Sequence, residues 1–153
     1  MGKLRLRITN ECAGLRAPRA LVTRLLATEY AAAPEAPEVV TVNLAILSDD
    51  AIARHNQRFK KKDGPTDVLA WDDGDPDPAT GVTHLGDIAV SGETAVREAA
   101  RRGHGWREEL ALYALHGLLH LLGMRDGTPA GRRAMAGAQA RAFERAGIDL
   151  PRG

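Results

Sequence analysis

The sequence is poor in cysteine, in aromatic residues and in long apolar runs, and each shortage excludes a class of protein. Cys12 is the single cysteine among 153 residues, so disulfide frameworks and thiolate metal sites are excluded. Aromatic residues make up 4% of the chain, which argues against binding nucleic acid by stacking on its bases. No apolar run approaches the ~20 residues of a membrane span, and the amino-terminal residues lack the apolar region of a signal peptide. We therefore expect a cytoplasmic protein without a membrane partner.

The chain also lacks an excess of charge of either sign. Lys and Arg number 21 and Asp and Glu number 20, giving a net charge of +1, whereas nucleic-acid-binding proteins usually show a basic excess. The balance is a cancellation between segments, because cations concentrate in Arg58–Lys62 and carboxylates in Asp72–Asp77. A run of charges is more often only solvated surface. For the basic run we favour contact with phosphate, since it directly precedes one of the motifs described below.

Length and hydrophobic patterning predict one α+β domain over residues 1–153. The composition, 44% hydrophobic and 27% charged, is that of a globular protein. Strands come early and helices late, which predicts a four-stranded mixed β-sheet packed with about five helices. We expect strands at 4–8, 39–47, 67–71 and 85–90, and helices at 18–32, 48–59, 91–102, 106–122 and 129–146.

The most informative segment carries two histidines and an aspartate. His116 and His120 are four residues apart in a strongly helical segment, so their imidazoles lie on one helical face and can grip one metal ion. Gly123 lets the chain leave the helix and turn back, and Asp126 then supplies a third ligand on the same side. Three protein ligands with an open fourth position are typical of a catalytic zinc.

The same segment has two other interpretations. A bare pair of histidines in an apolar helix is more often part of a satisfied core than a metal site; the glycine and the aspartate favour the metal. Zinc proteases of the metzincin type place a glutamate base directly after the first histidine, and here that position is Gly117. The segment therefore lacks the general base that peptide hydrolysis needs. Cleavage of RNA has less need of a dedicated carboxylate base, since a 2′-hydroxyl can attack while a metal and a cation stabilise the phosphorus centre.

Three ordered segments of the chain resemble the YbeY family, bacterial metal-dependent endoribonucleases of ribosomal RNA maturation. The segment Asn56–Trp71 resembles the family's stretch centred on Pro-Thr-Asp-Val-Leu-Ser-Phe. Leu85–Ser91 resembles its Leu-Gly-Asp-Ile strand, and His116–Asp126 resembles its three-histidine metal motif. The resemblance implies a mixed four-stranded sheet with a central, metzincin-like helix that bears zinc. It also implies cleavage of single-stranded RNA, at the 3′ end of small-subunit ribosomal RNA, and a role in ribosome quality control with the small subunit as partner.

Two positions depart from the family's pattern. The third metal ligand is Asp126 where the family has histidine, and a carboxylate would weaken the Lewis acidity of zinc and favour manganese or another hard divalent metal somewhat more. Lys60, expected to be catalytic, stands where the family has arginine, so the charge is kept but the bidentate grip on phosphate is lost. These departures motivate a second hypothesis, a ribosome-associated RNA-binding or assembly factor with weak or no catalysis.

Several other polar residues carry two interpretations each. Asp67 and Asp87 could orient a metal-bound histidine or simply make bonds at strand ends. His104 is by default a loop histidine, with a functional role as the alternative. His55 and His84 are expected to face solvent.

Overall fold

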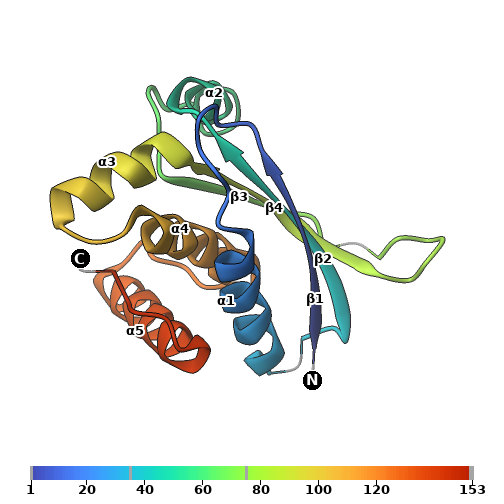
Figure 1. Ribbon diagram of the computed structural model, residues 1–153. Helices are drawn as coiled ribbons and strands as arrows, with labels where there is room; N and C mark the ends of the chain where they lie inside the picture. Colours follow the sequence, from blue (N-terminus) through green and yellow to red (C-terminus); the bar gives the residue numbers. More distant parts are fainter. Residues whose placement is uncertain (1, 35, 75, 152–153) are drawn as a thin grey trace.

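The computed structural model describes residues 2–34, 36–74 and 76–151, and its elements follow the expected order (Figure 1). Two expected ranges, 39–47 and 129–146, are reproduced at both ends. The strands are β1 (Lys3–Asn10), β2 (Val39–Leu47), β3 (Val68–Asp72) and β4 (Thr83–Ser91). The helices are α1 (Arg19–Ala32), α2 (Asp49–His55), the π-helix η1 (Asn56–Lys60), α3 (Gly92–Arg102), α4 (Trp106–Leu121) and α5 (Pro129–Ala146).

The sheet is four-stranded and mixed, as the sequence predicts. Its order is β1-β2-β4-β3, with β1 and β2 parallel, β2 and β4 parallel, and β3 antiparallel to β4. β3 is therefore an edge strand with one side of its backbone open. Along one row of the register Asn43 lies between Arg7 and Asp87, and Asp87 is in turn opposite Trp71 on β3.

Helices α1 and α4 pack on one face of the sheet, and α5 packs behind them (Figure 1). The main core lies in this layer, where the side chains of Leu25, Leu44, Ile88, Leu115 and Leu118 are at most 1% exposed. Burial of such side chains is the main force holding helices to sheet. The short helix α2 covers a smaller cluster formed by Leu47, Ile52, Leu69 and Ala89.

Capping residues explain where most helices begin and end. Ser48 and Ser91 accept hydrogen bonds from the amides of Ala51 and Thr94, which satisfies donors at the starts of α2 and α3. Gly103, with φ of 78°, closes α3 in the left-handed conformation that glycine adopts without strain.

The helix expected at 48–59 is present over that range, but only its first part is an α-helix. The chain passes from α2 into η1, whose wider π-type turn has no signal in hydrophobic periodicity. Lys61 ends η1 with φ of 57°, and it is the only non-glycine residue with positive φ among the described residues.

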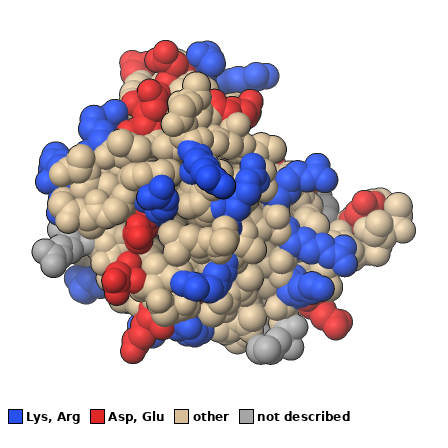
Figure 2. Space-filling model, in the orientation of Figure 1, with Lys and Arg blue, Asp and Glu red and all other residues tan. Residues whose placement is uncertain are grey.

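Both signs of charge appear on the face of the molecule shown in Figure 2, where acidic side chains lie beside Lys and Arg at the top, over α2. This mixing fits a net charge of +1 that arises by cancellation. Across the described residues, no helix combines the length and apolar character that crossing a membrane requires.

Candidate metal centre

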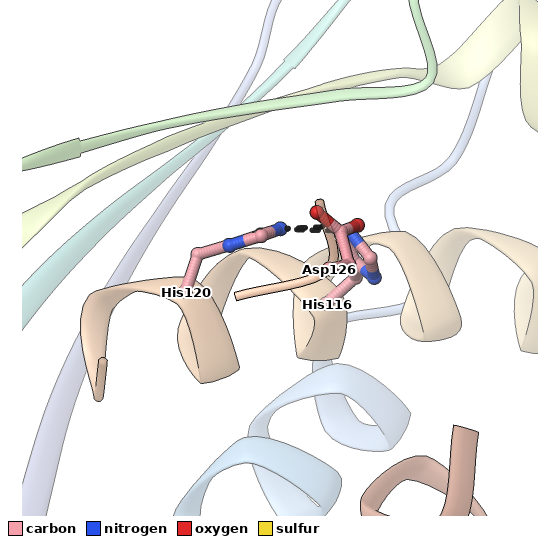
Figure 3. A group of neighbouring side chains, drawn as sticks. All are labelled: His116, His120 and Asp126. Atoms are coloured by element: carbon pink, nitrogen blue, oxygen red, sulfur yellow. Dashed lines mark hydrogen bonds and ion pairs between the residues drawn. The ribbon is translucent and has the colours of Figure 1, made fainter. Parts of the chain in front are cut away.

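His116 and His120 project from adjacent turns of α4, and the chain returns beyond Gly123 to bring Asp126 over them (Figure 3). The two Nε2 atoms are 2.9 Å apart, and Oδ2 of Asp126 lies 3.2 Å from Nε2 of His116 and 3.6 Å from Nε2 of His120. One ligand atom from each residue lies within 4.8 Å of the other two, so the group can hold a metal ion. The side chains are 24%, 26% and 40% exposed in that order, which leaves the centre open on one side.

The turn after α4 gives this arrangement its shape. Gly123 adopts φ of 101°, and the amide of Met124 donates to the carbonyl of Leu119, so the chain folds back sharply at the end of the helix. The Met124 carbonyl lies 3.0 Å from Nδ1 of His120. A carbonyl can only accept, so Nδ1 carries the proton and Nε2 presents its lone pair toward His116 and Asp126.

A residue of α5 holds the other histidine. The side-chain amide nitrogen of Gln139 lies 2.9 Å from Nδ1 of His116. Because Gln139 occupies Nδ1, Nε2 is the ring nitrogen that His116 turns toward His120 and Asp126. Sequence reasoning missed Gln139, which is 23 residues away in an Ala-rich helix and has no local signature.

The electrostatics of the centre favour neutral imidazole. Burial lowers the pKa of His116, and the adjacent His120 lowers it further, while the carboxylates of Asp126 and Asp67 oppose this shift. A neutral imidazole has a free lone pair, so protons compete less with a metal at neutral pH.

Lys60 and the metal centre share one hollow. A pocket of about 550 Å³ runs along the edge strand β3 and has Lys60 and His120 among its lining residues. Its wall is completed by Val68, Leu69, Ala70, Trp71, Asp72 and Arg125. The guanidinium of Arg125 donates to the carbonyls of His120 and Met124, so a second cation, which sequence reasoning missed, is held at the pocket beside the centre.

Gly117 faces the sheet. A Cβ on Gly117 would lie 2.6 Å from Cγ2 of Ile88, a buried residue of β4. The position that carries the glutamate base in zinc proteases therefore has no room for a side chain here. This geometry adds a steric reason to the absence of a base and counts against peptide hydrolysis.

Asp87 and His84 make their hydrogen bonds to residues outside the group formed by His116, His120 and Asp126. Asp87 accepts hydrogen bonds from Asn43 and from His84, at 3.0 and 3.1 Å. His84 also contacts Thr41, and its side chain is 26% exposed, so it is half-buried at the surface where the sequence predicts a solvent-facing histidine. Asp67 accepts a hydrogen bond from the Val68 amide. Unlike Asp87, it also influences the centre, because its charge opposes the lowering of the His116 pKa.

His104 belongs to a buried ionic group at the start of α4. Its Nε2 lies 2.5 Å from a carboxylate oxygen of Glu109, which has no exposed surface, and Arg102 approaches the other oxygen at 3.3 Å. Burial, followed by the hydrogen bond that its hydroxyl donates to the Glu109 carboxylate, raises the pKa of Tyr113. Glu109 lies two turns before His116 on α4, so this group fixes the start of the helix that carries both histidines.

Comparison with known proteins gives several matches. Residues 9–147 match the sequence model of the family described as Endoribonuclease YbeY. Endoribonuclease YbeY of Myxococcus xanthus is 42% identical over 98 residues, which are 63% of this chain and 33% of that protein. The same-named protein of Roseiflexus sp. is 43% identical over 55% of this chain and 56% of its own length, so the chain spans about a third to a half of these relatives.

A further relative and a solved structure match over more of their length. Endoribonuclease YbeY of Chloroflexus aurantiacus is 40% identical over 115 residues, 72% of this chain and 74% of that protein. The solution structure of TM1509 from Thermotoga maritima is similar over 92% of this chain and 88% of its own, with a TM-score of 0.61 and 26% identity. With the fold, the three ordered motifs and these matches in agreement, the chain belongs to the YbeY endoribonuclease family.

Proposed function

We propose that this protein is a metal-dependent endoribonuclease that cleaves single-stranded RNA. The observation that carries the proposal is the convergence of His116, His120 and Asp126 beside a pocket that also holds Lys60. Three ligands on one side of an ion leave a position open for substrate or water. Family membership supports a ribonuclease, and the basic run beside the pocket supports contact with a polyanion.

Each residue has a distinct part in this proposal. His116, His120 and Asp126 hold zinc, and the carboxylate ligand leaves room for manganese or another divalent metal. When bound, the metal supplies Lewis acidity toward a phosphoryl oxygen and lowers the pKa of a bound water. Lys60 contacts the scissile phosphate and stabilises the charge that develops on it.

The biological substrate we propose is ribosomal RNA, with maturation of the 3′ end of small-subunit RNA and ribosome quality control as the roles. The names of the relatives, all Endoribonuclease YbeY, support RNA as substrate. The small ribosomal subunit is then the partner, and the cytoplasm is where the two would meet.

Metal analysis combined with an RNA cleavage assay tests the activity. We expect about one equivalent of metal per chain, lost together with cleavage when His116 and His120 are both replaced by alanine. His84→Ala removes a histidine that lies outside the metal centre and serves as the control; it should keep both metal and cleavage. Wild-type protein that binds no metal would refute the catalytic proposal.

The second candidate is an RNA-binding assembly factor with little or no catalysis. It is favoured by the two departures from the family, Asp126 and Lys60. Asp126→His and Lys60→Arg restore the family's residues and should raise cleavage if the departures attenuate it. Metal-loaded protein that binds single-stranded RNA and never cleaves it, in wild type or in either variant, would establish this second candidate.

A further inference from the structure

Three rings meet at the surface between η1 and β3, although the composition suggested little capacity for stacking. Phe59 is 50% exposed, and its ring lies 5.9 Å from His55 in a stacked arrangement, with 13° between the planes. Trp71 lies edge-on to both, with centroids 5.5 Å from Phe59 and 5.9 Å from His55. An aromatic side chain half exposed beside two other rings keeps apolar ring surface open to solvent.

The backbone around the cluster has two unusual features. η1 has the π-type turn, and Lys61 follows it in the left-handed region with φ of 57° and ψ of 33°. Asn56, 5% exposed, holds the loop closed by donating to the carbonyl of Gly64 at 3.1 Å. π-turns and left-handed non-glycine residues cluster at functional sites, because a fold keeps such costly conformations only where they position something. Here they place Phe59 in the cluster while Lys60 lines the pocket.

The cluster adjoins the pocket of the metal centre. Trp71 lines that pocket together with Lys60 and His120, so one of the three rings belongs to the wall of the same hollow. The indole N–H of Trp71 is buried and has no hydrogen-bond partner in the described part of the chain, so packing alone holds this ring. A ring held only by packing can adjust when another flat group arrives.

The charges around the cluster suit a nucleic acid strand. The guanidinium carbon of Arg58 lies 5.3 Å from the centroid of the Phe59 ring, a cation–π contact. Lys60, Lys61 and Lys62 follow directly, and all are exposed. Aromatic faces interleaved with cations are how proteins hold single strands, with the cations on phosphates and the rings under bases.

We propose that Phe59, with Trp71 and His55 behind it, is the stacking site for one base of a single-stranded RNA whose phosphate faces the metal centre. The proposal rests on the proposed function, because it assumes an RNA substrate. The protein would then recognise its substrate in two ways, by contact with the phosphates and by stacking on one base. Duplex RNA, whose bases are already stacked, cannot use this site, so the cluster also selects single strands.

Equilibrium binding of a short single-stranded RNA to the full chain, in EDTA to prevent cleavage, tests the proposal. Phe59→Leu keeps the apolar bulk and removes the aromatic face, and should weaken binding roughly 5- to 100-fold. Phe59→Tyr keeps the face and should bind within about twofold of wild type. The salt dependence of binding should be unchanged in Phe59→Leu and shallower in Lys61→Gln, because only the lysine releases counterions.

Fluorescence gives an independent readout, since Trp71 and Trp106 are the only tryptophans in the chain. In a Trp106→Phe background, the RNA should quench Trp71. A series of the same oligonucleotide, each with one abasic position at a different place, locates the base that stacks. Quenching and affinity should both fall when the missing base is the one that contacts the cluster.

The outcomes separate this proposal from the proposed function. RNA that binds wild type and Phe59→Leu equally, without quenching, overturns the stacking site and leaves the nuclease proposal standing. Abasic strands that bind as tightly as intact ones overturn it too, and would make an apolar side chain of a protein partner the better occupant of the cluster. Wild-type protein that neither binds nor cleaves single-stranded RNA refutes both proposals.

Discussion

Gly117→Ala tests how closely α4 must approach the sheet to place His116 and His120. Glycine inside a helix normally costs about 1 kcal/mol relative to alanine, so propensity alone predicts that this change stabilises the protein. A Cβ at Gly117, however, would lie 2.6 Å from Cγ2 of Ile88 and 3.2 and 3.3 Å from two further atoms of the same side chain. The first distance is about 1 Å short of the optimal carbon–carbon separation.

Ile88 cannot relieve this overlap by moving outward, because it is 1% exposed in the core. Overpacking of this kind costs about 1–3 kcal/mol. The overlap therefore cancels or exceeds the propensity gain, with an expected net destabilisation of up to about 2 kcal/mol. Because His116 is adjacent and His120 lies one turn on, a displaced α4 should also bind metal more weakly.

Gly137→Ala in α5 is the matched control. There the nearest atom to a new Cβ is Nη1 of Arg141 at 3.2 Å, the far end of a flexible side chain, so the propensity gain of about 1 kcal/mol should survive. Thermal unfolding in EDTA compares the two variants, and their Tm values should differ by roughly 4–10 °C in favour of Gly137→Ala. Equal stabilisation by both substitutions would refute the close contact between α4 and β4.

The surroundings of His116 and the buried Glu109 carry three more expectations. Gln139→Leu should weaken metal binding about 10- to 100-fold, measured against a competing chelator; unchanged affinity would mean that the amide does not position His116. Burial and His120 lower the pKa of His116, so its contribution to stability of the metal-free protein is complete above the unfolded-state pKa of about 6.5 and is lost as the pH falls through the lower folded-state pKa. A Tm series from pH 7.5 to 5 should show this loss, and His116→Gln should flatten it. His104→Ala removes the shortest contact of the buried Glu109 carboxylate and leaves it the longer contact to Arg102 and the hydrogen bond with Tyr113. It should cost about 1–3 kcal/mol in urea unfolding; an unaltered midpoint would contradict a stabilising pair.

The sequence alone determined the parts of the protein that depend on neighbours along the chain. Helix geometry puts residues four apart on one face, so His116 and His120 were predictable as a pair, and Gly123 signalled the turn that returns Asp126. Strand composition with Ser and Gly at the boundaries predicted the order of elements and the mixed four-stranded sheet. These features follow from local periodicity and capping, which can be recognised in short segments of sequence.

Contacts between segments that are distant in the sequence follow from the packing of the whole chain. Gln139 reaches His116 because α5 packs against α4, and Lys60 shares a pocket with His120 because η1 ends beside the edge strand β3. The cluster of Phe59 with Trp71 shows the same limit: a composition of 4% aromatic residues records how few rings there are and carries no information on whether they meet. Such contacts depend on how helices and strands pack across the sheet, and packing is a property of the whole chain that no short segment records.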